Sequence, residues 1–144
     1  MTHGFDTSFL VAAEVGEHPE HAGTWRRLTA LRERDDRFGI TLPVLAEFPH
    51  IVTDSRRFTK PLTMTEAIEK ARIWWEAAEV ETITANEEAA RWFLEAMTKH
   101  QLGRKRVLDT MLAATYRSAG ITSLLTLNGA DFTVFGEFSC LGVA

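Results

Sequence analysis

Short runs rich in β-branched and aromatic residues alternate with longer segments of helical periodicity along almost the whole chain. The short runs end at Phe5 and cover residues 39–41, 80–84 and 121–127. Alternation of this kind is typical of a parallel sheet covered by helices. We therefore predict an α/β fold in three layers, α/β/α, with a small parallel sheet. The length of 144 residues, of which 45% are hydrophobic, fits one domain spanning 1–144.

Capping and breaking signals place the helices between these runs. Thr41 is a candidate N-cap, and Thr63 with Glu66 fits a capping box. Gly120 ends the last long helix. We expect the helix that carries Trp25 to end near residue 36.

Three local signals predict interruptions or turns. A proline at position 49 is expected to kink or break the helix that follows Thr41. Asn128-Gly129 predicts a tight turn after a strand, with Asp131 presented at the rim. The segment "FTVFGEF", residues 132–138, is predicted to form an edge hairpin.

Bulk charge and cysteine content restrict the function classes. The net charge of −4 disfavours broad attraction to phosphate backbones, so a nucleic-acid role would need a local site. The single cysteine, Cys140, excludes an internal disulfide and a cysteine-built metal site, and it fits a reducing cytoplasm. No signal peptide and no run long enough to cross a bilayer is found, so we expect a soluble, cytoplasmic protein without a membrane partner.

Asp109 is the only charged residue between Val107 and Tyr116, in a segment of strong helical character. Because burial of an unpaired charge is costly, this carboxylate must find a partner, lose its charge or bind a cation. A salt bridge to Arg106, one turn earlier, is the structural alternative.

Three further acids stand in similar contexts. Glu47 lies among apolar residues of a predicted helix, Asp6 follows the first strand, and Asp131 follows the last apolar run. Their ordinary roles would be helix caps for Asp6 and a turn for Asp131. If the four acids meet in the fold, they repel one another and need divalent cations for stability near neutral pH. Oxygen ligands favour Mg²⁺ or Mn²⁺ over zinc.

Four segments, in this order along the chain, resemble the motifs of PIN-domain proteins, in particular VapC-like toxins of bacterial toxin–antitoxin pairs. They are "FDTSFL" at Phe5, "VLAEF" at Val44, "VLDTMLAAT" at Val107 and "TLNGADF" at Thr126. The resemblance spans essentially the whole chain. It implies an endoribonuclease that depends on Mg²⁺ or Mn²⁺, with an RNA substrate, a homodimeric state and a cognate antitoxin whose C-terminal segment covers the acidic groove.

The resemblance also implies roles for individual residues. Asp6, Glu47 and Asp109 correspond to the catalytic, metal-binding acids. The fourth family acid can fall at the position held here by Asn128, so either Asn128 or Asp131 completes the metal site, and the number of metal ions stays open. Small hydroxyl residues of the family hold water, metal or phosphate, and these positions are occupied here by Thr7, Ser8 and Thr126, for which capping and turn formation are the alternative.

Basic clusters and histidines carry weaker signals. Arg104-Lys105-Arg106 precedes Asp109, so Arg104 and Lys105 are candidates for RNA phosphate binding. A second cluster, Arg56-Arg57 with Lys60, is interpreted as a solvated face. The five histidines show no ligand spacing and are interpreted as surface or packing residues.

Two other functions remain open at this point. The first is a catalytically silent binding module for protein or RNA, in which the acids only cap helices and pair with arginines. The second is an aspartyl-phosphate phosphatase with Asp6 as nucleophile. Against the phosphatase, its usual pattern has a second acid two residues later, where this chain has Ser8.

Overall fold

A computed structural model describes residues 1–143 and contains a five-stranded sheet in the order β3-β2-β1-β4-β5, with every pair of neighbours parallel. The strands are short, and the three central ones, β2, β1 and β4, are largely buried, as is usual for a sheet covered on both faces. Their bounds are Thr2–Phe5 (β1), Arg37–Ile40 (β2), Val80–Thr82 (β3), Ser123–Leu125 (β4) and Ser139–Leu141 (β5).

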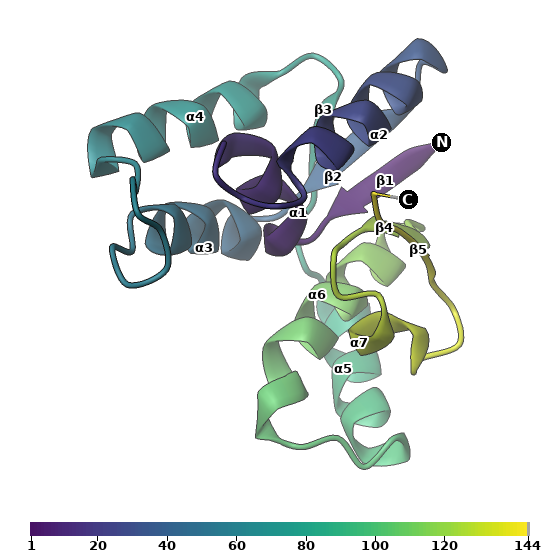
Figure 1. Cartoon of the computed structure of the whole chain (residues 1–144). Coiled ribbons are helices and arrows are strands. Elements are labelled where there is room, and N and C mark those ends of the chain that lie inside the picture. Colours follow the sequence, from purple (N-terminus) through teal and green to yellow (C-terminus); the bar gives the residue numbers. More distant parts are fainter. Residues whose placement is uncertain (144) are drawn as a thin grey trace.

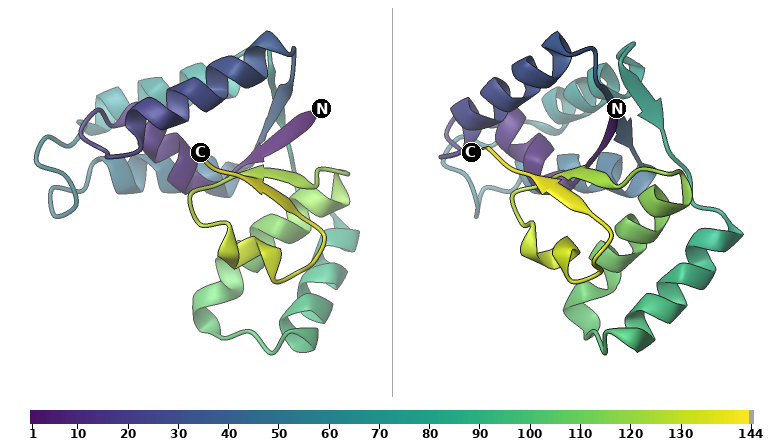
Figure 2. Two further views of the ribbon diagram at one scale, coloured as in Figure 1. Left: turned by 45° about the vertical axis from the view of Figure 1, so that its right-hand side comes forward. Right: turned by 90° about the vertical axis from the view of Figure 1, so that its right-hand side faces the viewer.

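Helices cover both faces of this sheet (Figure 1), which confirms the predicted three-layer α/β/α arrangement. On one side lie α1 (Thr7–Glu14), α2 (His21–Glu33), α3 (Leu42–Val52) and α4 (Met64–Glu76). On the other side lie α5 (Glu87–Lys99), α6 (Val107–Ser118) and the short α7 (Ala130–Thr133), with a 3₁₀ turn η1 (Arg104–Arg106) before α6. The two further views in Figure 2 show the same separation of the layers.

The predicted caps form as expected. Thr41 accepts a hydrogen bond from the backbone N–H of Val44, and Thr63 and Glu66 make both bonds of a capping box. Gly120, with a φ of +76°, follows the end of α6. Local chemistry therefore fixes these helix ends.

Two predicted helix features are wrong. The second helix ends at Glu33 rather than near Asp36, because Asp35 adopts a left-handed backbone (φ 58°) and the Asp36 side chain is buried in a polar network. Of the kink or break predicted at Pro49, the break is wrong, because α3 continues to Val52. Burial of Phe48, Pro49 and Val52 against the core stabilises the turn that lacks the proline N–H.

The edge hairpin predicted at 132–138 is also wrong. The chain forms α7, passes through Gly136 (φ +73°) and adds β5 parallel to β4. Phe132, Phe135 and Phe138 recur every three residues and are all buried, a spacing that does not match the two-residue period of a strand. The tight turn predicted at Asn128-Gly129 does form, because the Asp131 N–H donates to the Asn128 carbonyl (3.0 Å), and it leads into α7.

Tyr116 fixes α6 against the centre of the sheet. Its buried hydroxyl donates to the backbone carbonyls of Phe5 (2.6 Å) and Gly39 (3.1 Å). Its ring fills the space beside Gly4, where an added Cβ would lie 2.8 Å from ring carbons. The helix that carries Asp109 is thereby held at a set position over β1 and β2. Among residues 1–143, no helix is long and apolar enough to cross a membrane.

Candidate active site

The chain order of the sheet creates a crevice at the carboxyl ends of β1 and β4. After β1 the chain crosses to β2 on one side, whereas β4 is added on the other side of β1. Ligands of open α/β sheets bind at such a reversal. Asp6 directly follows β1 and donates its backbone N–H to the carbonyl of Leu125 at the end of β4 (2.9 Å). Asp6 and Thr126 therefore meet at the crevice.

Within residues 1–143, the Asp6 carboxylate is held by hydroxyls and not by a basic side chain. Thr126 Oγ1 donates to Asp6 Oδ2 at 2.7 Å, and Ser8 Oγ donates to the same oxygen at 2.9 Å. Asp6 precedes α1 at the N-cap position, but its side chain makes no capping bond, so the capping alternative does not describe it. Burial raises the pKa of Asp6, against the opposing effect of these hydroxyls.

Glu47 reaches the same region from α3. Thr7, at the start of α1, donates its hydroxyl to Glu47 Oε2 at 3.0 Å. Glu47 is half-buried and lines the same cavity as Asp6. The predicted hydroxyl residues Thr7, Ser8 and Thr126 thus all bond to acids at this crevice.

Asp109 projects from the first turns of α6 into this cavity. Within the described part of the chain, its carboxylate forms no hydrogen bond or ion pair. The predicted salt-bridge alternative is wrong, because Arg106 pairs with Asp131 instead. Partial burial and the negative charges of Asp6 and Asp131 raise the pKa of Asp109 to about 6. The positive charge of Arg106 acts in the opposite direction and compensates only part of this effect.

The candidates for the fourth ligand differ in their surroundings. Asp131 lies on α7 and receives a hydrogen bond from Arg106 Nη1. Its charge still raises the pKa of Asp6 and Asp109, so it lies near the other acids. Asn128 lines the cavity, whereas Asp131 does not.

Two adjoining hollows form one groove around the acids. We call them the α6 lobe (about 370 Å³), which includes Lys105 and Leu108, and the Asn128 lobe (about 480 Å³), which includes Ser8 and Asn128. Their shared wall consists of Asp6, Thr7, Glu47, Ile51, Arg57 and Asp109. Lys105 thus reaches the groove, whereas Arg104, which is exposed, lines neither lobe.

Arg57 is a groove residue that the sequence prediction missed. It lies in the loop between α3 and α4, in the cluster interpreted as a solvated face, and it lines both lobes. Its spacing of ten residues after Glu47, beyond the end of α3, does not by itself place it at the groove.

The donor chemistry of the groove matches a hard divalent cation. Carboxylate oxygens of three acids face one cavity, with an amide and hydroxyls beside them, and no sulfur or imidazole ligand is needed. In residues 1–143, however, no three acidic, histidine or cysteine side chains are drawn together closely enough to hold an ion. Like charges keep carboxylates apart, which accounts for groups that face one cavity without forming a closed ligand shell. The residues therefore fit such an ion by the type of their donor atoms.

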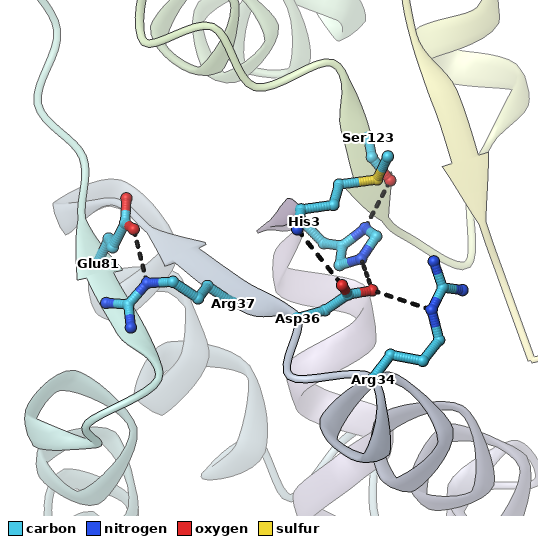
Figure 3. A network of polar contacts seen from close by, with 7 residues as sticks. His3, Arg34, Asp36, Arg37, Glu81 and Ser123 are labelled. Carbon is cyan, nitrogen blue, oxygen red and sulfur yellow. Dashed lines mark hydrogen bonds and ion pairs between the residues drawn. The ribbon is translucent and has the colours of Figure 1, made fainter.

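A second polar network lies at the opposite, amino ends of the strands (Figure 3). His3 Nδ1 lies 2.7 Å from Ser123 Oγ, and His3 Nε2 lies 3.0 Å from Asp36 Oδ2. Asp36 also forms ion pairs with the Met1 amino group (3.4 Å from Oδ1) and with Arg34 Nε (3.6 Å from Oδ2). The pKa of Asp36 is lowered, and the hydrogen bond from His3 is the largest cause. His3, Asp36 and Ser123 are all buried, so His3 has the packing role, one of the two roles predicted for the histidines.

Comparisons with known proteins agree with the motifs. The family model described as PIN domain matches residues 5–136, and the chain belongs to this family. No curated protein matches the sequence at a significant level.

Several solved toxin–antitoxin structures share the fold. VapBC2 from Rickettsia felis, solved with a promoter DNA fragment, superposes with a TM-score of 0.70 at 19% identity, over 99% of this chain and 98% of that one. A toxin–antitoxin complex from Klebsiella pneumoniae gives 0.65 at 15%, over 99% and 98%. VapC20 from Mycobacterium tuberculosis, a toxin that cleaves the sarcin–ricin loop, gives 0.63 at 18%, over 86% and 87%. The chain therefore has the fold of these VapC-type proteins.

Proposed function

We propose that this protein is an endoribonuclease that depends on Mg²⁺ or Mn²⁺ and serves as the toxin of a toxin–antitoxin pair. The observation that carries the proposal is the groove at the reversal point of the sheet, in which Asp6, Glu47 and Asp109 face one cavity and, within residues 1–143, form no ion pair. Membership of the PIN family and the VapC-type fold support it.

Asp6, Glu47 and Asp109 are the residues we assign to metal binding, with Asn128 or Asp131 as the fourth ligand. A bound Mg²⁺ or Mn²⁺ would activate water and stabilise the leaving oxygen of a phosphodiester. Thr126 and Ser8 fix the orientation of the Asp6 carboxylate, and Thr7 does the same for Glu47. Asp109, which no hydrogen bond restrains, is the carboxylate best placed to orient or deprotonate the attacking water.

The phosphatase alternative is weakened by the surroundings of Asp6. Ser8 occupies the position where that chemistry uses a second acid, and its hydroxyl bonds to the carboxylate oxygen. Thr126 bonds to the same oxygen, so two donors reduce its strength as a nucleophile. We therefore favour hydrolysis by an activated water over an aspartyl-phosphate intermediate.

The test is cleavage of single-stranded RNA by the purified full chain with Mg²⁺, with Mn²⁺ and with EDTA. We expect cleavage with either ion, loss of cleavage in EDTA, and restoration when Mg²⁺ is added back. In parallel, a Mn²⁺ titration of wild type and Asp6→Asn should show weaker binding by the variant. Equal Mn²⁺ binding by both proteins, with no RNA cleaved, would support the silent binding module instead.

The partner proposal is tested separately. A small DNA-binding protein encoded immediately upstream should co-purify with this chain and suppress cleavage. Light scattering of the free chain should give the mass of a homodimer. A monomeric mass would remove the dimer from the proposal and leave the nuclease assignment unchanged.

A further inference from the structure

The groove that we assign to RNA carries little positive charge of its own. Its shared wall holds three carboxylates, the chain has a net charge of −4, and a phosphate backbone would be repelled from such a wall. One bound divalent cation offsets only two of these three negative charges. A phosphate that enters the groove therefore needs basic side chains at its edges.

Arg57 is the basic residue that borders both lobes. Asp54, which begins the turn that carries Arg57, contacts the Nε atom of Arg57 through Oδ2 at 3.7 Å. Within the described residues, the Arg57 guanidinium forms no ion pair with Asp6, Glu47 or Asp109. The planar group is thus left with N–H donors suited to phosphate oxygens.

The loop that carries Arg57 is held in place on both sides. The backbone N–H groups of Arg57 and Phe58 donate to the carbonyl of Asp54 (3.1 and 3.2 Å). The Glu17 carboxylate, from the connection between α1 and α2, accepts the N–H groups of Thr59 (3.1 Å) and Lys60 (2.8 Å). Figure 1 shows this segment as the loop between α3 and α4. Arg57 is presented by an anchored turn, so less ordering is needed when it binds.

Lys105 borders the groove from the other layer. It lies in η1, three residues after Leu102, and lines only the α6 lobe. It forms no ion pair within residues 1–143. Arg57 from the loop after α3 and Lys105 before α6 therefore stand on opposite layers of the fold, with the acids between them.

We infer that Arg57 binds the phosphate that is cleaved and that Lys105 binds a flanking phosphate of the same strand in the α6 lobe. The assignment rests on the proposed nuclease function and adds the residues that position its substrate. Arg57 is given the reacting phosphate because it shares the wall of both lobes with the acids, whereas Lys105 reaches one lobe only.

Arg56 provides a matched control for Arg57. It has the same charge, lies in the same turn and pairs with the same residue, Asp54, at 3.2 Å. Its side chain is 90% exposed and lines neither lobe, whereas that of Arg57 is 61% exposed. Each alanine variant removes one positive charge and one ion pair with Asp54, and the two variants differ in access to the groove.

The experiment measures kcat/KM for cleavage of a single-stranded RNA by wild type, Arg57→Ala, Arg56→Ala and Lys105→Ala at several salt concentrations. We expect Arg57→Ala to lower kcat/KM by about tenfold or more, as for removal of a charged hydrogen bond. The slope of log kcat/KM against log salt concentration is negative, and its magnitude should decrease by about 0.7 for each phosphate that is no longer neutralised. Arg57→Lys should recover part of the rate, Lys105→Ala should mainly raise KM, and Arg56→Ala should stay within about twofold of wild type.

Equal decreases in Arg56→Ala and Arg57→Ala would overturn the inference, because general charge would then explain both. If the wild type cleaves no RNA, the proposed nuclease function itself is rejected, and cleavage can no longer test the role of Arg57. Anisotropy of a labelled single-stranded RNA then decides the binding role with the same variants. Weaker binding by Arg57→Ala than by Arg56→Ala supports it, and equal binding rejects it.

Discussion

The two ends of the central strand β1 each carry a buried aspartate in opposite electrostatic surroundings. Asp36, beside the amino end, contacts an imidazole, an amino terminus and a guanidinium, and its pKa is lowered. Asp6, at the carboxyl end, is held by two hydroxyls near other carboxylates, and its pKa is raised. The strand between them is only four residues long.

This difference separates Asp36, whose charge is balanced within the chain, from Asp6, to which we propose a function. At the amino end, charge and hydrogen bonds are balanced by residues of the chain itself, so nothing further is required there. At the carboxyl end, the carboxylates repel one another, and Asp6, Glu47 and Asp109 form no ion pair within residues 1–143. Such a group is stable only with a ligand or a shifted pKa. A buried acid alone thus indicates little, and its partners decide its role.

Asp109→Asn should have the largest effect on activity. Cleavage should fall by more than the roughly 10–100-fold that removal of an outer hydrogen bond to a ligand costs, because a neutral amide binds a hard cation poorly. The melting temperature in EDTA at pH 7 should rise, since one of several repelling charges is removed. RNA cleavage and thermal melting measure the two effects.

Glu95→Gln is the control for Asp109→Asn, since Glu95 is exposed on α5 and the net charge changes equally. Its cleavage rate and melting temperature should match those of wild type. A less stable Asp109→Asn protein with unchanged cleavage would show that Asp109 belongs with Asp36, as a structural acid.

Asp36→Asn should show the reverse pattern. The melting temperature should fall by several degrees, because His3, Arg34 and the amino terminus would no longer share an anionic partner. Cleavage below the melting range should stay within about twofold, since distant sites act independently. Asp35→Asn, at an exposed neighbour whose left-handed backbone asparagine tolerates, should change neither. A folded Asp36→Asn protein with poor cleavage would break the comparison.

The pH dependence of stability should separate the two ends more finely. Because the pKa of folded Asp109 is about 6, above the unfolded value, the folded state binds more protons and loses stability as pH rises from about 4 to 6. The stabilising effect of Asp109→Asn should therefore grow over this range and then level off.

The contribution of Asp36 to stability depends on pH in the opposite direction. Its folded pKa is lowered, so its contribution is present above the unfolded value, about 3.9, and is lost as pH falls through the folded pKa. The loss of stability of Asp36→Asn relative to wild type should become smaller only in strongly acidic buffer. Melting curves in EDTA across the pH range measure both trends, and parallel curves for wild type and Asp109→Asn would contradict the assignment.

Local chemistry made much of the fold predictable. Alternation indicated the α/β class, and the caps at Thr41 and Thr63 and the stop at Gly120 are short-range signals that the structure confirms. The C-terminal region was mispredicted because Phe132, Phe135 and Phe138 are placed by tertiary burial, which overrides local β propensity.

The site could be predicted only in part for a similar reason. Asp6, Glu47 and Asp109 stand out because each is an acid in an apolar or strand-end context. The pairing of Arg106 with Asp131 rather than Asp109 depends on how α7 packs beside η1, which no spacing reveals. Arg57 reaches the groove through a loop anchored by the distant Glu17, an interaction equally hidden in the sequence.

Tyr116 lies seven residues after Asp109, two turns along the same face of α6. Its hydroxyl is bonded to the backbones of β1 and β2, and its ring leaves no room for a side chain at Gly4. A methyl group at Gly4 would therefore displace the Tyr116 ring and tilt α6. The tilt would move the end of α6 that carries Asp109. A substitution at a residue without a side chain would in this way displace Asp109, which we propose as a metal ligand.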